Sequence, residues 1–521
     1  MSKTFRNPIL PGCYPDPSIC RVGDDYYLVT SSFEYFPGIP IYHSRDLVNW
    51  RQIGHVLDRN SQLRLEDVRP SGGLYAPTIR YWQGKFYLVN TLVDGKHRSG
   101  NFIVTATDAH GPWSEPFWLE SAPGFDPSLF FDDDGRTWYT GNRPAVQSQY
   151  EGHTEIWLQE LDIKNMCLIG EPIILWDGAL KGAVWAEAPH LYKVHGQYYL
   201  MIAEGGTAHQ HAVTVARSDR VDGPYEAYRG NPILTHRHLG LNHPIVGAGH
   251  ADLVETQTGE WWLVLLAMRP YGGYFYNLGR ETFLAPVVWE DDWPLVSPGT
   301  GRVEFTYPTP NLPECLWPAA PTCDHFDNII LTSQWNVLRT PYEKFWSLSE
   351  RPGFLRLRLR PERLSERTTP SFIGRRQQHI HFTMEAAIEF IPQTGQEYAG
   401  LALVQNPDFH FLLIVTKTTD PVVRLIKRAY GVDAVLAEKP VHAGPLYIKV
   451  EGNGQVYNFY AASGQKKWFP IADEIDGRIL STPIAGGFLG TFIGMYASSN
   501  GQPSTNRADF DWFEYIGLDE P

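Results

Sequence analysis

The sequence is poor in cysteine, in positive charge and in long apolar runs. Its 521 residues include five cysteines and no CxxC pair, which argues against a disulfide framework or a structural zinc site. Lys and Arg number 44 against 58 Asp and Glu, and a surface of net negative charge repels phosphate, so no nucleic-acid partner is expected. No run approaches the roughly 20 apolar residues of a membrane span, so no membrane partner is expected either.

The first residues also lack a recognisable targeting signal. The segment 1–8 reads MSKTFRNP and has no apolar core of the kind found in secretory signals. We therefore expect a cytoplasmic location. The composition, 43% hydrophobic and 13% aromatic, is that of a globular chain with an excess of aromatic residues.

Internal repetition dominates the first 300 residues. Five short aromatic segments recur, each preceded by polar or glycine turn residues, with starts about 50–65 residues apart, which is the scale of a four-stranded propeller blade. A large irregular β-sandwich is the alternative. The pattern favours a five-bladed β-propeller over residues 1–306. The five segments are 25–29, 85–89, 136–139, 197–201 and 260–264.

The composition changes after the repeats. Residues 307–323 contain five prolines, which suit an extended linker because proline fixes φ and removes a hydrogen-bond donor. Beyond it, residues 354–360 (FLRLRLR) alternate with period two, and Gly452-Asn453-Gly454 separates two strand-like runs. We expect an antiparallel β-sandwich over 324–521. The whole chain is predicted to be all-β.

Ionisable residues recur about ten residues upstream of four of the five aromatic segments. The upstream segments are 14–18, 75–78, 125–128, 187–190 and 249–252. Because equivalent positions of successive blades are related by rotation about the propeller axis, their side chains should converge on one central site. Asp16, Asp126, Glu187 and His250 are therefore predicted to meet there.

A cluster of three carboxyl groups has a direct use in glycoside hydrolysis. One carboxylic acid protonates the leaving oxygen, and a carboxylate on the other face activates water or attacks the sugar. A third can keep the pKa of the acid high. Taken singly, each Asp-Pro is more simply a turn or a surface carboxylate. The joint alignment favours catalysis.

The same segments carry a family resemblance. Asn7-Pro8-Ile9-Leu10 with Tyr14-Pro15-Asp16-Pro17-Ser18, and then 44–50 (SRDLVNW), resemble the opening of glycoside hydrolase family 43. Later motifs follow in the family's order at 73–80, 125–128, 187–192, 203–207 and 278–282. The segments 487–494 and 508–511 resemble the C-terminal sandwich of the family's two-domain β-xylosidases.

The resemblance implies roles for individual residues. Asp16 matches the general base, Glu187 the general acid, and Asp126 the carboxylate that tunes and orients the acid. It implies an inverting reaction, in which base and acid lie roughly 6.5–9.5 Å apart to admit a water. Residues expected to contact the sugar are Phe33, Tyr75, Thr207, Arg280 and Phe492, with Phe492 reaching in from the sandwich. Trp185 is a weaker candidate.

His250 matches a histidine on the propeller axis, near which some family members hold a calcium ion or a water. A divalent ion there would lower the repulsion between the carboxylates, although calcium prefers oxygen ligands. Glycoside hydrolysis itself requires no cofactor. We therefore expect Ca²⁺ beside His250 only in a supporting role.

The sequence thus predicts an exo-acting enzyme that releases D-xylose from the non-reducing ends of small β-1,4-xylo-oligosaccharides, with α-L-arabinofuranosidase activity in the same pocket. The alternative is mainly an α-L-arabinofuranosidase acting on arabino-oligosaccharides. Tyr75 stands where many family members have Trp. Because its side chain is smaller and carries a hydroxyl, it bears on the choice between a xylopyranose and an arabinofuranose. A non-catalytic sugar-binding propeller is a more remote alternative, and a homo-oligomer remains open.

Overall fold

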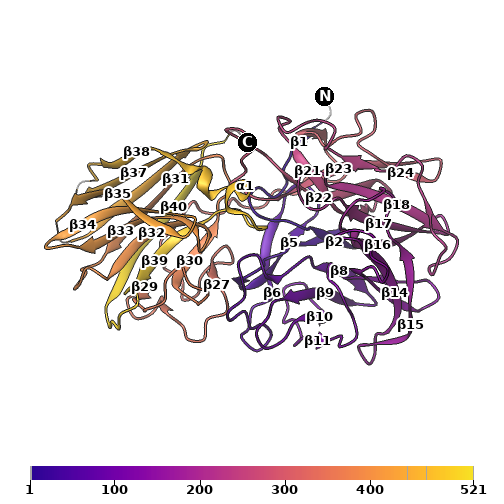
Figure 1. Cartoon of the computed structure of the whole chain (residues 1–521), viewed down its shortest axis with the longest axis horizontal. Helices are drawn as coiled ribbons and strands as arrows, with labels where there is room; N and C mark the ends of the chain where they lie inside the picture. Colours follow the sequence, from indigo (N-terminus) through magenta and orange to yellow (C-terminus); the bar gives the residue numbers. More distant parts are fainter. Residues whose placement is uncertain (1–2, 443, 465, 520–521) are drawn as a thin grey trace.

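The computed structural model describes residues 3–442, 444–464 and 466–519. Two strand-rich domains lie side by side (Figure 1). The part of the chain so described is almost entirely β-structure, with one short helix, α1 (Thr482–Ala485), and one 3-10 turn, η1 (Gly477–Leu480). None of the helices in those ranges has the length and apolar character needed to cross a membrane.

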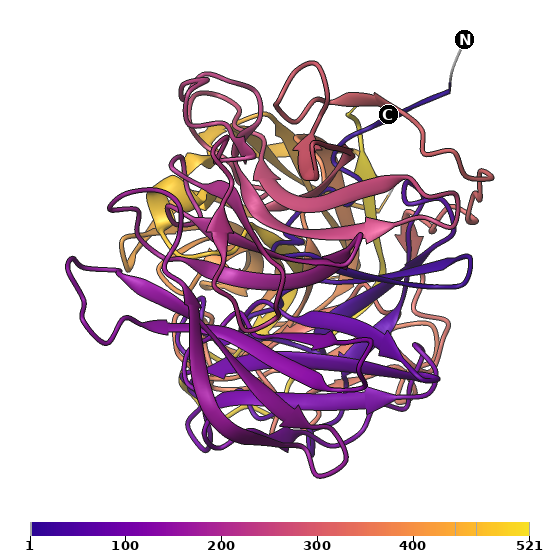
Figure 2. The same cartoon turned by 90° about the vertical axis from the view of Figure 1, so that its right-hand side faces the viewer.

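The first domain is a five-bladed β-propeller, as predicted (Figure 2). Each blade uses consecutive strands of the chain. The blades are β2 (Ser18–Val22), β3 (Asp25–Val29), β5 (Gly38–Ser44) and β6 (Arg51–Leu57); β7 (Gly73–Leu74), β8 (Thr78–Trp82), β9 (Lys85–Val93), β10 (Gly100–Ala106) and β11 (Phe117–Trp118); β12 (Ser128–Phe131), β13 (Thr137–Pro144), β14 (Thr154–Asp162) and β15 (Cys167–Trp176); β16 (Glu187–Val194), β17 (Gln197–Glu204), β18 (Ala212–Ser218), β19 (Glu226–Ala227) and β20 (Leu234–Thr235); and β21 (Val246–Glu255), β22 (Trp261–Met268), β23 (Glu281–Glu290) and β24 (Trp293–Val296). Each predicted aromatic segment lies largely in the strand that pairs with the innermost strand of its blade (β3, β9, β13, β17 and β22).

The aromatic residues of these strands pack the blades together. Tyr26, Tyr139 and Tyr199 are all at most 1% exposed, and burying a side chain of this size stabilises the fold by about 2–3 kcal/mol. The innermost strands β2, β8, β12, β16 and β21 contact their neighbours in a closed ring around the axis. The residues just before or at the start of β2, β8, β12 and β16, and His250 at the irregularity within β21, therefore face a common centre.

The second domain is an antiparallel β-sandwich, also as predicted. Leu355 and Leu357 are fully buried, whereas Arg356 and Arg358 between and beyond them are not, in keeping with one wet face. One sheet contains β26 (Cys323–Asp324), β28 (Trp346–Ser347), β29 (Leu355–Arg358), β40 (Arg507–Gly517), β31 (His381–Glu389), β36 (Leu446–Asn453), β37 (Val456–Ser463) and β38 (Phe469–Asp476). The other runs β35 (Val432–Pro440), β34 (Pro421–Ala429), β33 (Phe409–Lys417), β32 (Tyr398–Asn406), β39 (Phe492–Ser498), β30 (Ser371–Arg376), β27 (Asn336–Leu338) and β4 (Tyr35–Phe36).

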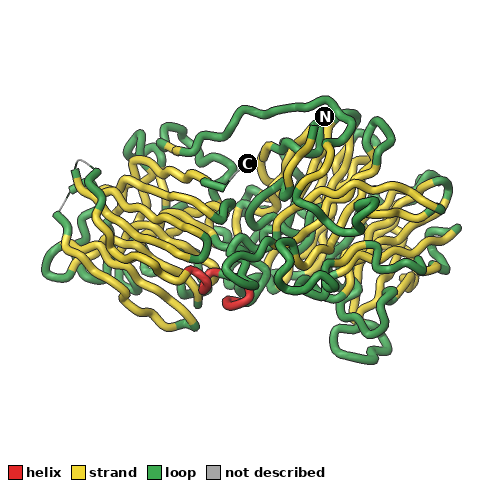
Figure 3. Tube along the Cα trace, turned by 90° about the horizontal axis from the view of Figure 1, so that it is seen from above, coloured by secondary structure: helices red, strands yellow, loops and turns green. Residues whose placement is uncertain are grey.

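Strand β4 belongs to the propeller by sequence but completes a sheet of the sandwich. Phe36 pairs with Val337 and Tyr35 with Leu338, so the two domains share a sheet. The helical turns α1 and η1 lie at the same junction (Figure 3).

The proline-rich segment is also tied to the propeller. Near its start, β25 (Thr306–Pro308) pairs with β1 (Thr4–Arg6). Further on, the Trp317 indole donates a hydrogen bond to the Asn49 carbonyl at 3.0 Å, and the Arg51 guanidinium lies 4.0 Å from its ring. The segment is thus extended but docked on the first blade.

Candidate active site

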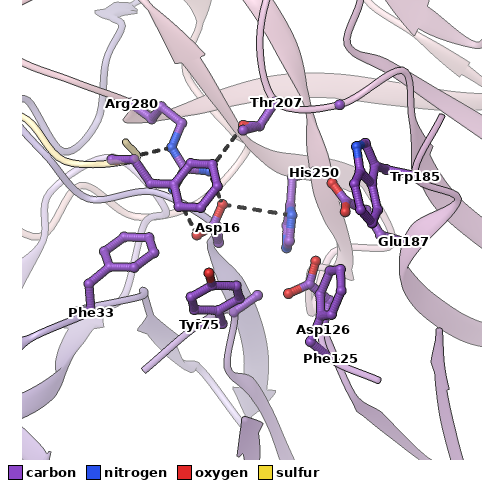
Figure 4. A pocket seen from close by; sticks show the side chains of 13 residues that line it. Asp16, Phe33, Tyr75, Phe125, Asp126, Trp185, Glu187, Thr207, His250 and Arg280 are labelled. Atoms are coloured by element: carbon purple, nitrogen blue, oxygen red, sulfur yellow. Dashed lines mark hydrogen bonds and ion pairs between the residues drawn. The ribbon is translucent and has the colours of Figure 1, made fainter. Parts of the chain in front are cut away.

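The axial segments of all five blades meet at one cavity of about 270 Å³. The structure brings together the three carboxyl groups predicted from the repeats, as well as His250 (Figure 4). His250 lies between Asp16 and Glu187 in this view. The lining residues are Asp16, Phe33, Tyr75, Ala76, Phe125, Asp126, Trp185, Glu187, Gly206, Thr207, His250, Arg280 and Phe488.

The backbone is strained where it presents these side chains. Asp16, Asp126 and His250 have φ of 56°, 53° and 47°, in the left-handed region that residues other than glycine seldom adopt. Such conformations persist where the surrounding fold enforces them, and they cluster at functional sites. In the fourth blade the strained residue is Ala188, with φ of 51°, directly after Glu187.

Asp16 is held as a carboxylate. Its Oδ1 accepts a hydrogen bond from Arg280 Nη1 at 2.7 Å, and its Oδ2 accepts one from Ser31 Oγ at 2.6 Å. His250 Nδ1 lies 3.7 Å from Oδ1. Burial alone would raise the pKa of Asp16, but Arg280, His250 and the Ser31 hydrogen bond outweigh it and lower the pKa below the ordinary range. Asp16 is therefore ionised and can accept a proton.

Glu187 and Asp126 behave in the opposite way. Burial, followed by the negative charge of Asp16, raises the pKa of Glu187 to about 8. Burial, followed by the charges of Glu187 and Asp16, raises the pKa of Asp126 well above its usual range. At neutral pH this side of the cavity holds a proton, which is the state a general acid requires.

Arg280 organises the Asp16 side of the cavity. Besides Asp16, its Nη1 donates to Thr207 Oγ1 at 3.0 Å and its Nε donates to the Phe488 carbonyl at 3.4 Å. The guanidinium carbon lies 5.6 Å from the Phe33 ring centre and 5.3 Å from that of Phe488. A single cation thus holds the carboxylate, the Thr207 hydroxyl and the sandwich loop together.

Aromatic rings form the remaining wall. Phe33 contacts Tyr75 edge to face at 5.8 Å, and Tyr75 in turn lies 6.0 Å from both Phe125 and Phe488. The Tyr75 hydroxyl accepts a hydrogen bond from Arg69 Nη2 at 3.2 Å. Phe33 and Tyr75 therefore occupy the predicted wall positions.

The prediction that Phe492 lines the pocket is wrong. Phe492 is fully buried and stacks on Tyr35 at 3.6 Å inside the sandwich. As the first residue of β39 it belongs to the sheet, and its ring packs in a buried cluster that the sandwich shares with Phe33 and Tyr35. Phe488, four residues earlier in a loop, enters the cavity instead. The sandwich therefore contributes to the site, but through Phe488.

Hydrogen bonds hold the Phe488 loop against the propeller. Phe488 N donates to Ser71 Oγ at 2.8 Å, and Thr491 N donates to the Asn277 carbonyl at 2.8 Å. Gly279 and Gly490 pack so closely that a Cβ at Gly490 would lie 2.4 Å from the Leu278 carbonyl oxygen.

We expect Phe488→Ala to lower kcat/KM about tenfold, because losing an apolar wall removes roughly 1–2 kcal/mol of substrate contact. Steady-state kinetics on xylobiose measure this, with Phe488→Leu as the control that keeps an apolar side chain. Unchanged kinetics in the alanine variant would mean that the sandwich loop does not touch substrate.

Sequence reasoning missed a second polar layer on the axis. Arg80 Nη1 donates to Asp252 Oδ2 at 2.8 Å, and Ser18 Oγ donates to the same oxygen at 2.7 Å. Arg80 Nη2 also donates to His190 Nδ1 at 3.0 Å. Despite burial, Arg80 lowers the pKa of Asp252 well below its usual range. Ser18, His190 and Asp252 each lie two or three residues after an axial residue, which is the repeat signal that could have revealed the layer.

The donors beside His250 do not suit calcium as a direct ligand set. The residues that the structure describes contain no group of three or more His, Cys, Asp or Glu side chains placed to hold a metal. Near His250 the closest carboxylate is Asp16, which already pairs with Arg280 at 2.7 Å. Calcium takes six to eight oxygen ligands. The side chains that the structure describes around His250 therefore do not form a direct calcium site.

Comparisons with known proteins agree with this geometry. Residues 5–294 match the model for glycosyl hydrolases family 43, and residues 323–516 match the beta xylosidase C-terminal Concanavalin A-like domain. A xylosidase/arabinosidase of Butyrivibrio fibrisolvens is 46% identical, over 97% of this chain and 98% of that protein. A non-reducing end alpha-L-arabinofuranosidase of Bacteroides ovatus is 42% identical, over 99% of this chain and 96% of that protein.

Solved structures give the same answer. The crystal structure of a xylan beta-1,4-xylosidase from Bacillus halodurans superposes with a TM-score of 0.93 at 39% identity, covering 98% of this chain and 99% of that one. The family and sandwich matches together span most of the chain. The chain therefore belongs to glycosyl hydrolase family 43 and is an inverting glycoside hydrolase.

Proposed function

We propose that the enzyme removes single D-xylose residues from the non-reducing ends of short β-1,4-xylo-oligosaccharides. The observation that carries this proposal is a small cavity with an ionised Asp16 on one side and a protonated Glu187 on the other. The Phe488 loop narrows the cavity from the sandwich side, which favours the end of a chain over its middle. Small oligosaccharides are thus the proposed partners, and the cytoplasmic location and any homo-oligomer stay predictions.

The mechanism follows from the protonation states. Glu187 gives its proton to the glycosidic oxygen as the bond to the anomeric carbon breaks, and Asp16 takes a proton from the attacking water. The water oxygen bonds to the face opposite the leaving group, so the configuration inverts. Burial and the negative charge of Asp16 keep Glu187 protonated, Asp126 orients the acid, and Arg280 holds Asp16 in the ionised form.

The second candidate, α-L-arabinofuranosidase activity in the same pocket, is supported by the name of the Bacteroides ovatus relative. Hydrolysis rates on aryl β-D-xyloside and on aryl α-L-arabinofuranoside, measured with one enzyme preparation, give the ratio of xylosidase to arabinofuranosidase activity. We expect both substrates to be cleaved, with NMR showing inversion at the anomeric carbon. Cleavage of neither would favour a non-catalytic sugar-binding propeller.

Trp185 is proposed to stack against the leaving-group sugar. It lies two residues before Glu187, is 40% exposed, and its ring centre is 6.3 Å from that of Phe125. Figure 4 shows Trp185 and Glu187 on the side of the cavity away from Arg280. Because Glu187 protonates the leaving oxygen, the departing sugar leaves on this side.

We expect Trp185→Ala to lower kcat/KM on xylobiose about tenfold through KM, since one ring–sugar contact contributes roughly 1–1.5 kcal/mol. The inhibition constant of free D-xylose, which fills the other subsite, should stay unchanged. If D-xylose binding weakened equally, Trp185 would contact the xylose at the non-reducing end rather than the leaving-group sugar.

A further inference from the structure

A second and larger cavity, of about 710 Å³, lies between the two domains. Blade 1 contributes Trp50 and Arg51, the proline-rich segment contributes Trp317, and the sandwich contributes Arg375 and Arg376. None of these residues lines the catalytic cavity. The interdomain cavity is therefore a separate site.

Its three arginines have no carboxylate partner. No ion pair in the described part of the chain, at 4.0 Å or less, involves Arg51, Arg375 or Arg376, although many other arginines of this acidic protein are paired. Arg51 instead stacks on Trp317 at 4.0 Å. Arg376 Nε donates to the Cys13 carbonyl at 2.7 Å.

Arg375 is the least satisfied of the three. Its Nη2 donates to Gln378 Oε1 at 2.8 Å and its guanidinium lies 4.7 Å from the Tyr515 ring, but its buried Nε has no hydrogen-bond partner. Burial lowers the pKa of Arg375. A desolvated cation is costly unless the charge of an anion offsets it, and Arg375 lines the cavity in which such an anion would bind.

The carboxylates that line the cavity offset this charge only in part, since Asp324 acts on Arg375 from beyond ion-pair distance. Asp324 already accepts hydrogen bonds from Phe326 N at 2.9 Å and from Trp335 Nε1 at 2.8 Å. Asp327 is the other acidic lining residue. Two carboxylates against three guanidinium groups leave a positive excess in a chain whose net charge is -14.

The apolar part of the lining indicates a ligand that contains a ring. The indole nitrogens of Trp50 and Trp317 are committed to the Leu47 and Asn49 carbonyls at 2.8 and 3.0 Å, so these rings offer apolar surface rather than donors. Aromatic surface binds sugar rings, and guanidinium groups bind carboxylate or phosphate in bidentate geometry. We propose that the interdomain cavity binds an acidic sugar, whose carboxylate or phosphate pairs with Arg375.

Isothermal titration calorimetry with the full-length protein tests the proposal. The probes are D-glucuronate, glucose 6-phosphate and inorganic phosphate, with D-glucose as the neutral control, each in the presence of saturating D-xylose to fill the catalytic pocket. We expect at least one acidic sugar to bind and D-glucose not to bind. Glucuronate and glucose 6-phosphate distinguish the two anions, and inorganic phosphate shows how much the ring contributes.

Two substitutions locate the ligand. Arg375→Gln and Arg51→Gln should each weaken binding at least tenfold while leaving turnover on aryl xyloside unchanged. Arg220→Gln, which removes one charge from an exposed ion pair in blade 4, is the matched control and should bind like the wild type. Arg51 is exposed, so its variant remains informative if Arg375→Gln fails to fold.

The proposal is overturned if no acidic probe binds at millimolar concentration, if binding survives both substitutions, or if Arg220→Gln weakens it equally. Binding of D-glucose as tightly as glucuronate would also contradict an anion site. These outcomes do not depend on which glycoside the catalytic pocket cleaves.

Discussion

Replacing Glu187 by glutamine is expected to lower kcat/KM on xylobiose by about 10²–10⁴-fold, because the leaving oxygen then departs without a proton. The loss should be much smaller on an aryl xyloside whose phenolate leaves readily. Steady-state kinetics on both substrates measure the contrast. Glu151→Gln, an exposed carboxylate in blade 3, is the matched control.

The pH profile gives the same variant a second readout. Since the raised pKa of Glu187 is about 8, wild-type activity on xylobiose should fall as pH rises through this value and the acid loses its proton. The fall belongs to the coupled pair of Glu187 and Asp126 rather than to one residue alone. In Glu187→Gln the alkaline fall should vanish. Equal losses on both substrates, with the alkaline fall retained, would remove Glu187 from the role of acid.

Asp16→Asn is expected to lower turnover by at least about 10²-fold on every substrate, because the attacking water loses its proton acceptor whatever the leaving group. The asparagine keeps the size of the side chain and can still accept a hydrogen bond from Ser31, so folding should survive. Circular dichroism and the melting temperature check this.

The two variants are distinguished by their dependence on the leaving group. Asp16→Asn should show the same loss on xylobiose and on aryl xyloside, in contrast to Glu187→Gln. A loss below tenfold on both substrates would mean that another group activates the water. His250, 3.7 Å from Asp16, would be the first residue to test in that case.

The repeats allowed the convergence of Asp16, Asp126, Glu187 and His250 to be predicted, because rotation about a propeller axis follows from blade spacing alone. Their protonation could not be predicted in the same way. Asp16 and Asp126 share an Asp-Pro motif and similar φ, yet the pKa of one is lowered and that of the other raised. The difference comes from neighbours distant in sequence: Arg280, 264 residues away, donates a hydrogen bond to Asp16, whereas Asp126 faces the charges of Glu187 and Asp16.

Contacts between the domains were the least accessible to sequence reasoning. The motif at 487–494 indicated that the sandwich reaches the pocket, but Phe488 and Phe492 are both aromatic residues in one short run. Which ring enters the pocket depends on where β39 begins, at Phe492. Strand ends are set by pairing with residues far away, here Arg376, and periodicity in one segment does not locate them.

The strand Tyr35–Phe36 has a consequence for biosynthesis. It leaves the ribosome some 300 residues before its partner Asn336–Leu338, so the nascent propeller carries a segment that cannot yet pair. Conversely, a sandwich made alone would present β27 as a bare sheet edge, and such edges recruit other chains. We expect residues 324–521 expressed alone to self-associate in analytical ultracentrifugation, and a propeller supplied in trans to suppress this. A monomeric isolated sandwich would show that the edge is protected without the borrowed strand.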